Sequence, residues 1–403
     1  MPKDWRSTLP IVLSLVVLSP LAIDVYLPSF PEMMGVFKVN DKAMQLTVSL
    51  FMVCVGAGQL VGGPLSDRFG RRATALWGTA IYIVGSLIGA SSETISTLYL
   101  SRAMQGIGAA SCTVTAFAWV RDHFNAIESG KWITYMGGII GVVPTLAPLL
   151  GGVLASQWGW SANFLFMALF GALIFAGVWL FIPPGVSGCI HAKGSLQQAS
   201  LKNSVAEILE NRQFILYSMA GMLTMGAILS YTTHAPIVAM TMGGLDEFQF
   251  ALVFGGLGIL KLSISLLAPE IVRVIGRRLT ILIGLGISIS GGAGLWFVPG
   301  SDPLLFFVPA AIGYIGFTLV FGTASGLTLE PFKHCSGVAA AIDGCARMAG
   351  GGLISALLKV LDLQVFHTVS LSYCLLVIPF LFVLRDILSR SETSAGTEID
   401  QAA

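Results

Sequence analysis

The sequence predicts an all-α integral membrane protein with twelve transmembrane helices in two related halves of six. Of its 403 residues, 55% are hydrophobic and 11% are charged, whereas a soluble protein carries roughly 25% charged residues. The apolar residues form continuous runs, as membrane helices require, and do not alternate with polar ones as in membrane barrels. An arginine-rich turn at 63–72 recurs in weaker form at 273–278, which indicates an internal repeat.

Each predicted span is an apolar segment close to the ~20 residues that a helix needs to cross a bilayer. The segments cover roughly 8–28, 44–64, 73–91, 95–119, 132–155, 161–182, 213–240, 248–270, 279–298, 303–328, 336–358 and 363–385. A polar linker, 183–212, separates the sixth span from the seventh. The predicted domains are therefore 1–182, the cytoplasmic linker 183–212, 213–386, and a disordered, polar cytoplasmic tail at 387–403.

Lysine and arginine residues set the predicted orientation. Loops on the side of the N-terminus hold most of them, and loops on the opposite side hold Lys38, Lys42 and Lys359. Because basic residues concentrate in cytoplasmic loops, both termini are expected in the cytoplasm. A net charge of +1 argues against a nucleic-acid partner. The cysteines occur singly and without a CxxC pair, so no metal site is expected.

Glycines and prolines mark spans that pack closely or bend. Three glycine pairs have the GxxxG spacing that lets helix backbones approach each other: Gly58/Gly62, Gly137/Gly141 and Gly322/Gly326. Ordinary packing and a moving interface both explain these pairs. Pro144 and Pro148, one turn apart in the fifth span, free backbone carbonyls and bend the helix. That bend could serve function or packing.

Four segments of the N-terminal half resemble motifs of the major facilitator superfamily. Residues 63–72, Gly-Pro-Leu-Ser-Asp-Arg-Phe-Gly-Arg-Arg, resemble its loop between helices 2 and 3. Residues 102–109, Arg-Ala-Met-Gln-Gly-Ile-Gly-Ala, resemble the fourth-helix motif of its proton-linked members. Residues 147–152, Ala-Pro-Leu-Leu-Gly-Gly, resemble the antiporter motif, with Ala147 where that motif has glycine. Residues 20–28, Pro-Leu-Ala-Ile-Asp-Val-Tyr-Leu-Pro, resemble the first helix of the Bcr/CflA drug-efflux branch.

The resemblance implies the major facilitator fold, in which two six-helix bundles surround a central cavity lined by helices 1, 4, 7 and 10. It further implies a monomeric secondary transporter of the bacterial inner membrane that exports small drug-like compounds in exchange for protons by alternating access. Its partners would be a small-molecule substrate and the lipid bilayer, with the proton as coupling ion and no cofactor or metal. The antiporter bend would comprise four residues: Pro144, Pro148, Gly151 and Gly152.

Other functions are weighed against this one. A proton-coupled transporter of a metabolite, such as a nucleoside or an amino-acid derivative, is the alternative, because a fold does not specify its substrate. The sequence shows no HExxH motif, no clustered metal ligands and no paired catalytic carboxylates, so an enzyme is not expected. An ATP-driven pump would need a GxxxxGK[ST] loop, and a receptor would need a longer loop than this sequence offers.

Charged residues inside the spans are candidates for function because their burial is costly. Asp24 and Arg102 fall at similar depths in helices 1 and 4, which are neighbours in the family fold. The two could pair or share a polar cavity, and movement that separates them would capture or release a proton. A permanent structural pair, or an Asp24 that is simply hydrated, would explain the same residues.

A second group of charged residues lies in the C-terminal half. Asp343 and Arg347 are four residues apart and share a helix face, so they can pair. Lys261 falls at a similar depth, and the three would form a charge network. The network could brace the bundle, or it could act in gating or in selecting substrates by charge.

Several polar and aromatic residues are candidates for the substrate cavity: Tyr26, Gln105, Tyr231, His234 and Tyr314. The imidazole of His234 could carry protons at neutral pH, although a hydrated histidine near the outer surface would look the same in the sequence. Aromatic residues near helix ends also serve as packing or interfacial anchors.

The turn at 63–72 contains six residues that could form a cytoplasmic latch: Gly63, Asp67, Arg68, Gly70, Arg71 and Arg72. Asp67 is placed to favour a nearby helix N-terminus, and the arginines can pair or meet anionic lipid. The family resemblance implies that this latch holds one access state closed. Arginines alone would set orientation, but orientation does not require Asp67 or Gly70.

Overall fold

The computed structural model describes residues 5–183, 205–299, 301–332 and 336–402. Its helices in the first half are α1 (Trp5–Leu15), α2 (Leu18–Asp24), η1 (Leu27–Ser29), α3 (Phe30–Phe37), α4 (Asp41–Phe69), α5 (Arg71–Ala90), α6 (Ile95–His123), α7 (Ala126–Trp158) and α8 (Ser161–Phe181). Those of the second half are α10 (Arg212–Pro236), η2 (Ile237–Met242), α11 (Glu247–Ile275), α12 (Arg277–Leu295), η3 (Pro303–Phe306), α13 (Phe307–Leu329), α14 (Ser336–Cys345), η4 (Ala346–Gly350), α15 (Gly351–Leu358), η5 (Lys359–Leu361), α16 (Val365–Cys374) and α17 (Val377–Ala402).

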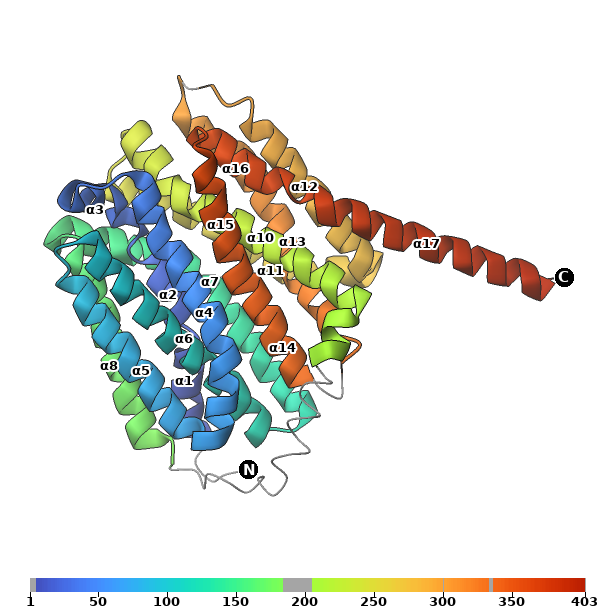
Figure 1. Cartoon of the computed structure of the whole chain (residues 1–403), viewed down its shortest axis with the longest axis horizontal. Coiled ribbons are helices and arrows are strands. Elements are labelled where there is room, and N and C mark those ends of the chain that lie inside the picture. The colour runs from blue at the N-terminus through green and yellow to red at the C-terminus, as the bar shows by residue number, and fades with distance from the viewer. Residues whose placement is uncertain (1–4, 184–204, 300, 333–335, 403) are drawn as a thin grey trace.

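The predicted helical membrane fold is confirmed. Within the described ranges, eleven helices are long and apolar enough to cross a membrane, and a bent pair brings the number to twelve. That pair, Ser7–Leu15 and Leu18–Phe37, is bent by 41°, and counting it as one span makes it the first. The two halves of the chain lie side by side as separate groups of helices (Figure 1).

Side-chain caps fix where several spans begin. The side chains of Asn40, Thr94, Asn125 and Asn211 each accept a backbone N–H in the first turn of α4, α6, α7 and α10. Such caps satisfy donors that a helix N-terminus leaves unpaired. These polar residues therefore fix the residue at which each of these helices begins.

The two ends of the molecule differ in charge. The basic end carries the turns at Gly70, Phe124 and Gly276 with their neighbouring arginines. The far end carries the turns at residues 38–40, 91–94, 159–160, 243–246 and 362–364.

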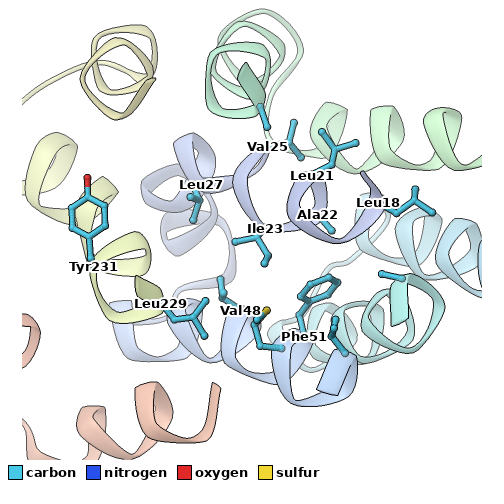
Figure 2. Close-up of a cluster of buried hydrophobic side chains, with 14 of the residues drawn as sticks. Leu18, Leu21, Ala22, Ile23, Val25, Leu27, Val48, Phe51, Leu229 and Tyr231 are labelled. Atoms are coloured by element: carbon cyan, nitrogen blue, oxygen red, sulfur yellow. The ribbon is translucent and has the colours of Figure 1, made fainter. Parts of the chain in front are cut away.

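The two bundles meet through one continuous apolar core. Side chains of α2, η1 and α4 belong to the same buried cluster as Leu229 and Tyr231 of α10. Figure 2 shows Ile23 and Leu27 of the first span on the side that faces α10. The described part of the core therefore joins the bundles around the first span.

Contact between α7 and α11 stops part of the way toward the basic end. A Cβ added to Gly258 of α11 would lie 2.5 Å from Thr145 Oγ1, and one added to Gly152 would lie 3.0 Å from the Glu247 oxygen. Closer to the basic end, Gly141 and Gly137 have no atom of another element within 4 Å of an added Cβ. Where α7 faces α11, the two bundles are therefore in contact toward the far end of the molecule and separated toward its basic end.

The three GxxxG pairs predicted from the sequence fall into a packed group and an unpacked group. Gly58 packs on α6, where an added Cβ would lie 2.7 Å from Ala110 Cβ, so its close approach is real packing. The pairs Gly137/Gly141 and Gly322/Gly326 have nothing within that 4 Å limit. For these two pairs the packing interpretation is wrong in this conformation.

Helix α17 extends to Ala402, across the C-terminal tail (Figure 1). The disorder expected at 387–403 stays a prediction. A polar composition removes the reason to pack against a core, but helical hydrogen bonds are local and need no core. Of the predicted linker, residues 184–204 lie outside the described ranges.

Candidate functional site

Asp24 lies at the last residue of α2, just before the chain turns into η1, and is only 5% exposed. It interacts electrostatically with Lys261 of α11 and with Tyr314 of α13. Both partners belong to the second bundle. The carboxylate of the first span therefore faces the opposite bundle.

The predicted partnership of Asp24 with Arg102 is wrong in this conformation. Arg102 is fully buried, and its Nη2 donates to the carbonyl of Ala22 at 2.8 Å. Its Nη1 donates to Gln105 Oε1 at 2.5 Å. The guanidinium also lies 4.5 Å from the ring centres of both Tyr26 and Phe51. These contacts of the Arg102 guanidinium, to backbone, amide and aromatic rings, thus lie inside the first bundle, and its Nε is buried without a hydrogen-bond partner among the described residues.

The predicted charge network of the second bundle separates into two parts. Arg347 Nε donates to Asp343 Oδ2 at 2.8 Å, as the four-residue spacing predicts, and both side chains are almost fully buried. Arg347 Nη1 also donates to the carbonyl of Phe321 at 2.8 Å. Lys261 is not part of this pair. Its Nζ lies 6.0 Å from the ring centre of Tyr314, on the side of Asp24.

The other predicted cavity residues are buried. Tyr26, Gln105 and Tyr231 are fully buried, His234 is 4% exposed and Tyr314 is 7% exposed. Gln105 donates to Ser86 Oγ at 2.8 Å, and Tyr26 shares a hydrogen bond with Thr47 at 2.7 Å. These two residues are internal to the first bundle, whereas Tyr314 of the second bundle interacts electrostatically with Asp24.

An apolar groove lies between the first span and α7. It has a volume of about 520 Å³ and is lined by Val17, Leu21, Tyr135, Gly138, Ile139, Val142, Val143, Leu146, Ala147 and Leu150. Leu21 precedes Asp24 by one turn on the same face of α2. The groove therefore borders α2, the helix that ends at Asp24.

Sequence reasoning did not identify this groove. Its lining consists of ordinary apolar residues, which periodicity cannot distinguish from lipid-facing ones. The available signal was the glycine-rich stretch of α7, where Gly137, Gly138 and Gly141 leave the helix surface uncovered.

The predicted antiporter bend contains a close contact between helices. α7 runs as one helix through Pro144 and Pro148. A Cβ added to Gly151 would lie 1.7 Å from the carbonyl oxygen of Val25, in the turn that follows Asp24. Gly151 therefore lets α7 touch the backbone at the site of the carboxylate.

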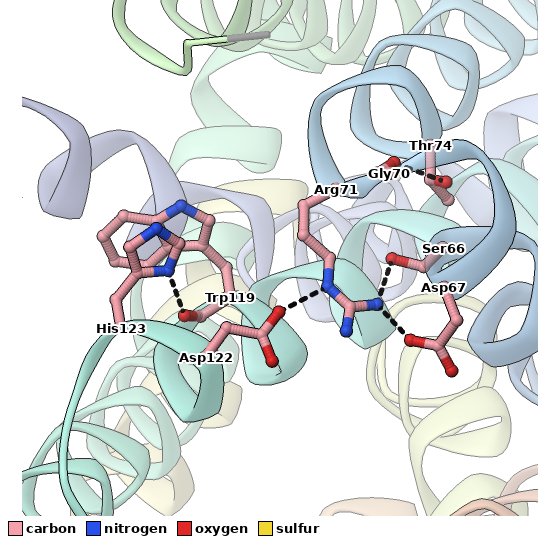
Figure 3. A network of polar contacts seen from close by, with 8 residues as sticks. All are labelled: Ser66, Asp67, Gly70, Arg71, Thr74, Trp119, Asp122 and His123. Atoms are coloured by element: carbon pink, nitrogen blue, oxygen red, sulfur yellow. Dashed lines mark hydrogen bonds and ion pairs between the residues drawn. The ribbon is translucent and has the colours of Figure 1, made fainter. Parts of the chain in front are cut away.

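The latch turn at the basic end is an ion-pair network within the first bundle (Figure 3). Arg71 Nη1 donates to Asp67 Oδ1 at 2.6 Å and to Ser66 Oγ at 3.0 Å, while its Nε donates to Asp122 Oδ2 at 2.7 Å. Arg72 donates to the carbonyl of Trp179 at 2.6 Å. These contacts join α4, α5, α6 and α8.

The remaining latch residues also lie within the first bundle. Gly70 adopts φ +88°, a conformation that favours glycine, where α4 ends and α5 begins. Arg68 lies 5.3 Å from the ring centre of Phe69, and Gly63 packs beside Val114. In this conformation the described contacts of the turn do not reach the second bundle.

The second half repeats this arrangement, as the sequence predicts. Gly276 adopts φ +81° between α11 and α12, like Gly70. Arg277 pairs with Glu330 at 2.8 Å, in the position where Arg71 pairs with Asp122. Arg278 pairs with Asp386 at 3.2 Å. The two basic turns are therefore equivalent parts of two related bundles.

Arg71 is expected to stabilise the first bundle because its guanidinium fork, Nε and Nη1, donates to Asp122 and Asp67 at the same time. Arg71→Lys keeps the charge but cannot bridge Asp67 and Asp122 in the same geometry. Because both carboxylates are partly exposed, the expected loss is roughly 1 kcal/mol. A thermal-shift measurement on purified protein checks this, with the exposed Arg273→Lys as the control. A melting temperature equal to that of the control would contradict the role of the fork.

At the far end, charged contacts link the bundles. Lys42 of α4 forms an ion pair with Asp362, which follows η5. Lys359 of η5 donates to Ser49 Oγ of α4 at 3.2 Å. The hydrogen bond and the positive charge of Lys42 hold the pKa of Asp362 below its usual value.

This lowered pKa predicts a pH-dependent far-end contact. The ionised Asp362 contributes stability to the closed far end above its ordinary pKa, and the contribution is lost as pH falls through the lowered pKa. Lys42→Ala should therefore loosen the far end slightly at neutral pH and have no effect at low pH. The effect is small because both groups are exposed and salt screens them.

Distances between spin labels on Val36 and Val360, two exposed far-end positions in different bundles, would measure this change. Lys38→Ala, in the same far-end turn, is the matched control. An unchanged distance distribution for Lys42→Ala at neutral pH would show that the ion pair contributes nothing.

Comparison with known proteins agrees with this architecture. The sequence profile described as Major Facilitator Superfamily matches residues 12–355. The multidrug resistance protein MdtL of Klebsiella pneumoniae is 27% identical over 356 residues, which cover 88% of each chain. MdtL of Escherichia coli O157:H7 is 28% identical over 341 residues, covering 84% of this chain and 85% of that one.

Solved structures show the same fold at low sequence identity. The crystal structure of a D-xylose-proton symporter superposes with a TM-score of 0.76 at 18% identity, over 94% of this chain and 97% of that chain. A partially occluded, inward-open structure of the xylose transporter XylE from E. coli gives a TM-score of 0.74 at 15% identity, over 95% and 97%. These neighbours and the family are transporters and not enzymes, and this chain belongs to the Major Facilitator Superfamily.

Proposed function

We propose that this protein is a secondary transporter of the bacterial inner membrane that exports small drug-like compounds in exchange for protons. The observation that carries the proposal is the apolar groove of about 520 Å³ beside α2, the helix that ends at the buried carboxylate of Asp24. Apolar pockets with few polar groups suit small amphiphilic molecules. The multidrug resistance names of the relatives support the same class of substrate.

The basic end is assigned to the cytoplasm. Its loops carry Arg68, Arg71, Arg277 and Arg278, and basic loops favour the cytoplasmic side. With this orientation the structure represents an inward-facing state, closed at the far end and separated between α7 and α11 at the cytoplasmic end. Alternating access then requires the far-end contacts to part and the cytoplasmic ends to close.

Proton coupling is assigned to Asp24 and Lys261, in place of Asp24 and Arg102. A buried carboxylate needs a neutralising partner, which can be a proton or a nearby cation. In this state Lys261 of the opposite bundle attracts Asp24 electrostatically, and we assign it as that cation. When the bundles part at the far end, Lys261 moves away, and a proton from outside neutralises Asp24. On return, Lys261 and an incoming substrate together replace the proton, which leaves to the cytoplasm.

The latch turn has a supporting role in this cycle. In the inward-facing state Asp67 is held by Arg71 of its own bundle. We assign the turn to the contact that closes the cytoplasmic end in the outward-facing state, where its carboxylate or arginines would meet the second bundle. Each monomer contains both bundles and the complete groove, so a single chain is proposed as the transporting unit.

Everted membrane vesicles test the proposed function. The expected result is uptake of cationic or neutral drugs driven by an acidic interior and abolished by an uncoupler. A panel that also includes nucleosides and amino-acid derivatives separates drug export from metabolite transport. Uptake of a metabolite and no drug would overturn the proposed substrate class, and uptake that persists with the uncoupler would overturn proton coupling.

A further inference from the structure

The far-end contact between the bundles contains six buried polar residues, here called the far-end polar cluster: Gln45 and Ser49 of α4, Ser230 and His234 of α10, Ser355 of α15, and Lys359 of η5. Each is at most 8% exposed. Helix α15 packs against both α4 and α10 (Figure 1). The cluster therefore lies where three spans from the two bundles meet.

Packing contacts place these residues around one site. A Cβ added to Gly352 would lie 3.0 Å from the Ser49 oxygen, which brings this face of α4 against α15. Gln45 is one turn from Ser49 on the same face. On the other side of α15, Gly351 meets Gly226 of α10. Two turns further along α10, His234 interacts electrostatically with Lys359.

Several atoms of the cluster are buried without a hydrogen-bond partner. They are both side-chain atoms of Gln45, Nε2 and Oε1, and the hydroxyl oxygens of Ser230 and Ser355. Lys359 donates to Ser49 Oγ and has electrostatic attraction from Asp41. Among the described residues, no carboxylate forms an ion pair with its ammonium within 4.0 Å. Buried polar atoms are normally satisfied by protein or by ordered water.

We propose that the far-end polar cluster binds ordered water molecules, which form a hydrated layer inside the closed far-end contact. Water fits the unpartnered set because it both donates and accepts hydrogen bonds, and the set includes the acceptor Gln45 Oε1 as well as donors. An inorganic anion would suit Lys359 but leave that acceptor unsatisfied.

This hydration gives the contact a mechanical property. Polar groups that already bond water when the far end is closed lose little when the bundles part and bulk water enters. Parting of α4 from α15 then costs the polar groups of the cluster little hydrogen bonding. This inference depends on the far-end geometry and not on the identity of the substrate.

Radiolytic hydroxyl labelling of the full-length purified protein detects bound water directly. The far end is locked by a short thiol-specific crosslinker between K42C and D362C, in a background with the native cysteines replaced by serine. We expect His234 to remain labelled in the locked protein, severalfold above Met167, a buried residue inside the first bundle. Loss of His234 labelling on locking would mean that water arrives only through opening, and would overturn the proposal.

The variant Gln45→Met distinguishes a hydrated cluster from a dry one by the sign of its effect. If the cluster is hydrated, the variant removes water-mediated bonds, and the melting temperature should fall. If it is dry, the variant removes two unsatisfied atoms, and the melting temperature should rise. Gln59→Met, at a half-buried position of the same helix, controls for the loss of a glutamine from α4. A rise specific to Gln45→Met would overturn the proposal.

Discussion

Replacing Gly151 with alanine is expected to abolish transport and to reduce the amount of folded protein in the membrane. The added Cβ would lie 1.7 Å from the Val25 carbonyl oxygen, which is backbone and cannot move aside alone. Either α7 shifts away from the first span, or the turn beside Asp24 is distorted. Overpacking of this kind costs typically about 1–3 kcal/mol and sometimes more. Transport in everted vesicles and size-exclusion profiles after solubilisation measure the two effects.

Gly141→Ala is the matched control, because it makes the same change in the same helix. Gly141 has no atom of another element within 4 Å of an added Cβ. Alanine also favours a helix interior by roughly 1 kcal/mol over glycine, so this variant should be neutral or slightly more stable. Equal behaviour of Gly151→Ala and Gly141→Ala would show that the α7 contact with the first span is not needed.

Asp24→Asn is expected to remove transport driven by a pH gradient while leaving the binding of neutral compounds intact. Asparagine keeps the size of the side chain but can neither take up a proton nor attract Lys261. Driven uptake should fall by roughly tenfold or more, a change of about 1.4 kcal/mol per factor of ten. Vesicle uptake together with binding of a fluorescent drug separates the loss of coupling from the loss of the site.

Two further variants test the assignment of the partner. Lys261→Gln should also impair driven transport, because Asp24 then lacks the cation that replaces its proton. Arg347→Gln removes another buried cation, one that is paired with Asp343 and lies outside the Asp24 site. It should lower stability without changing the pH dependence of the transport that remains. A pH dependence that shifts with Arg347→Gln and not with Lys261→Gln would contradict the assignment.

Hydropathy was sufficient to predict the spans, because an apolar run has few alternatives to a membrane helix. The role of the latch turn as a polar contact site could also be predicted from the sequence, because Asp67, Gly70 and Arg71 are close in sequence and their contacts are mostly local. The repeat at Gly276 and Arg277 follows the same logic. Local pairs such as Asp343 with Arg347 depend on helix geometry alone.

Contacts between the two bundles could not be predicted from hydropathy or from local spacing in the sequence. Depth along the membrane placed Asp24 and Arg102 together, but depth does not give the direction of a side chain around its helix. Asp24 interacts electrostatically with Lys261, and Arg102 points to the backbone of Ala22. Lys359 was predicted in an exposed loop, yet the closed far end buries it against Ser49.

The measurement that most directly tests the exchange of partners at Asp24 is proton release on drug binding by purified protein in weakly buffered detergent. If a bound drug and Lys261 together displace the proton from Asp24, adding drug should acidify the solution. Asp24→Asn should bind the drug without acidification, and Arg347→Gln should acidify as the unmodified protein does. Equal acidification by Asp24→Asn and the unmodified protein would contradict the account, because the proton would then come from another group.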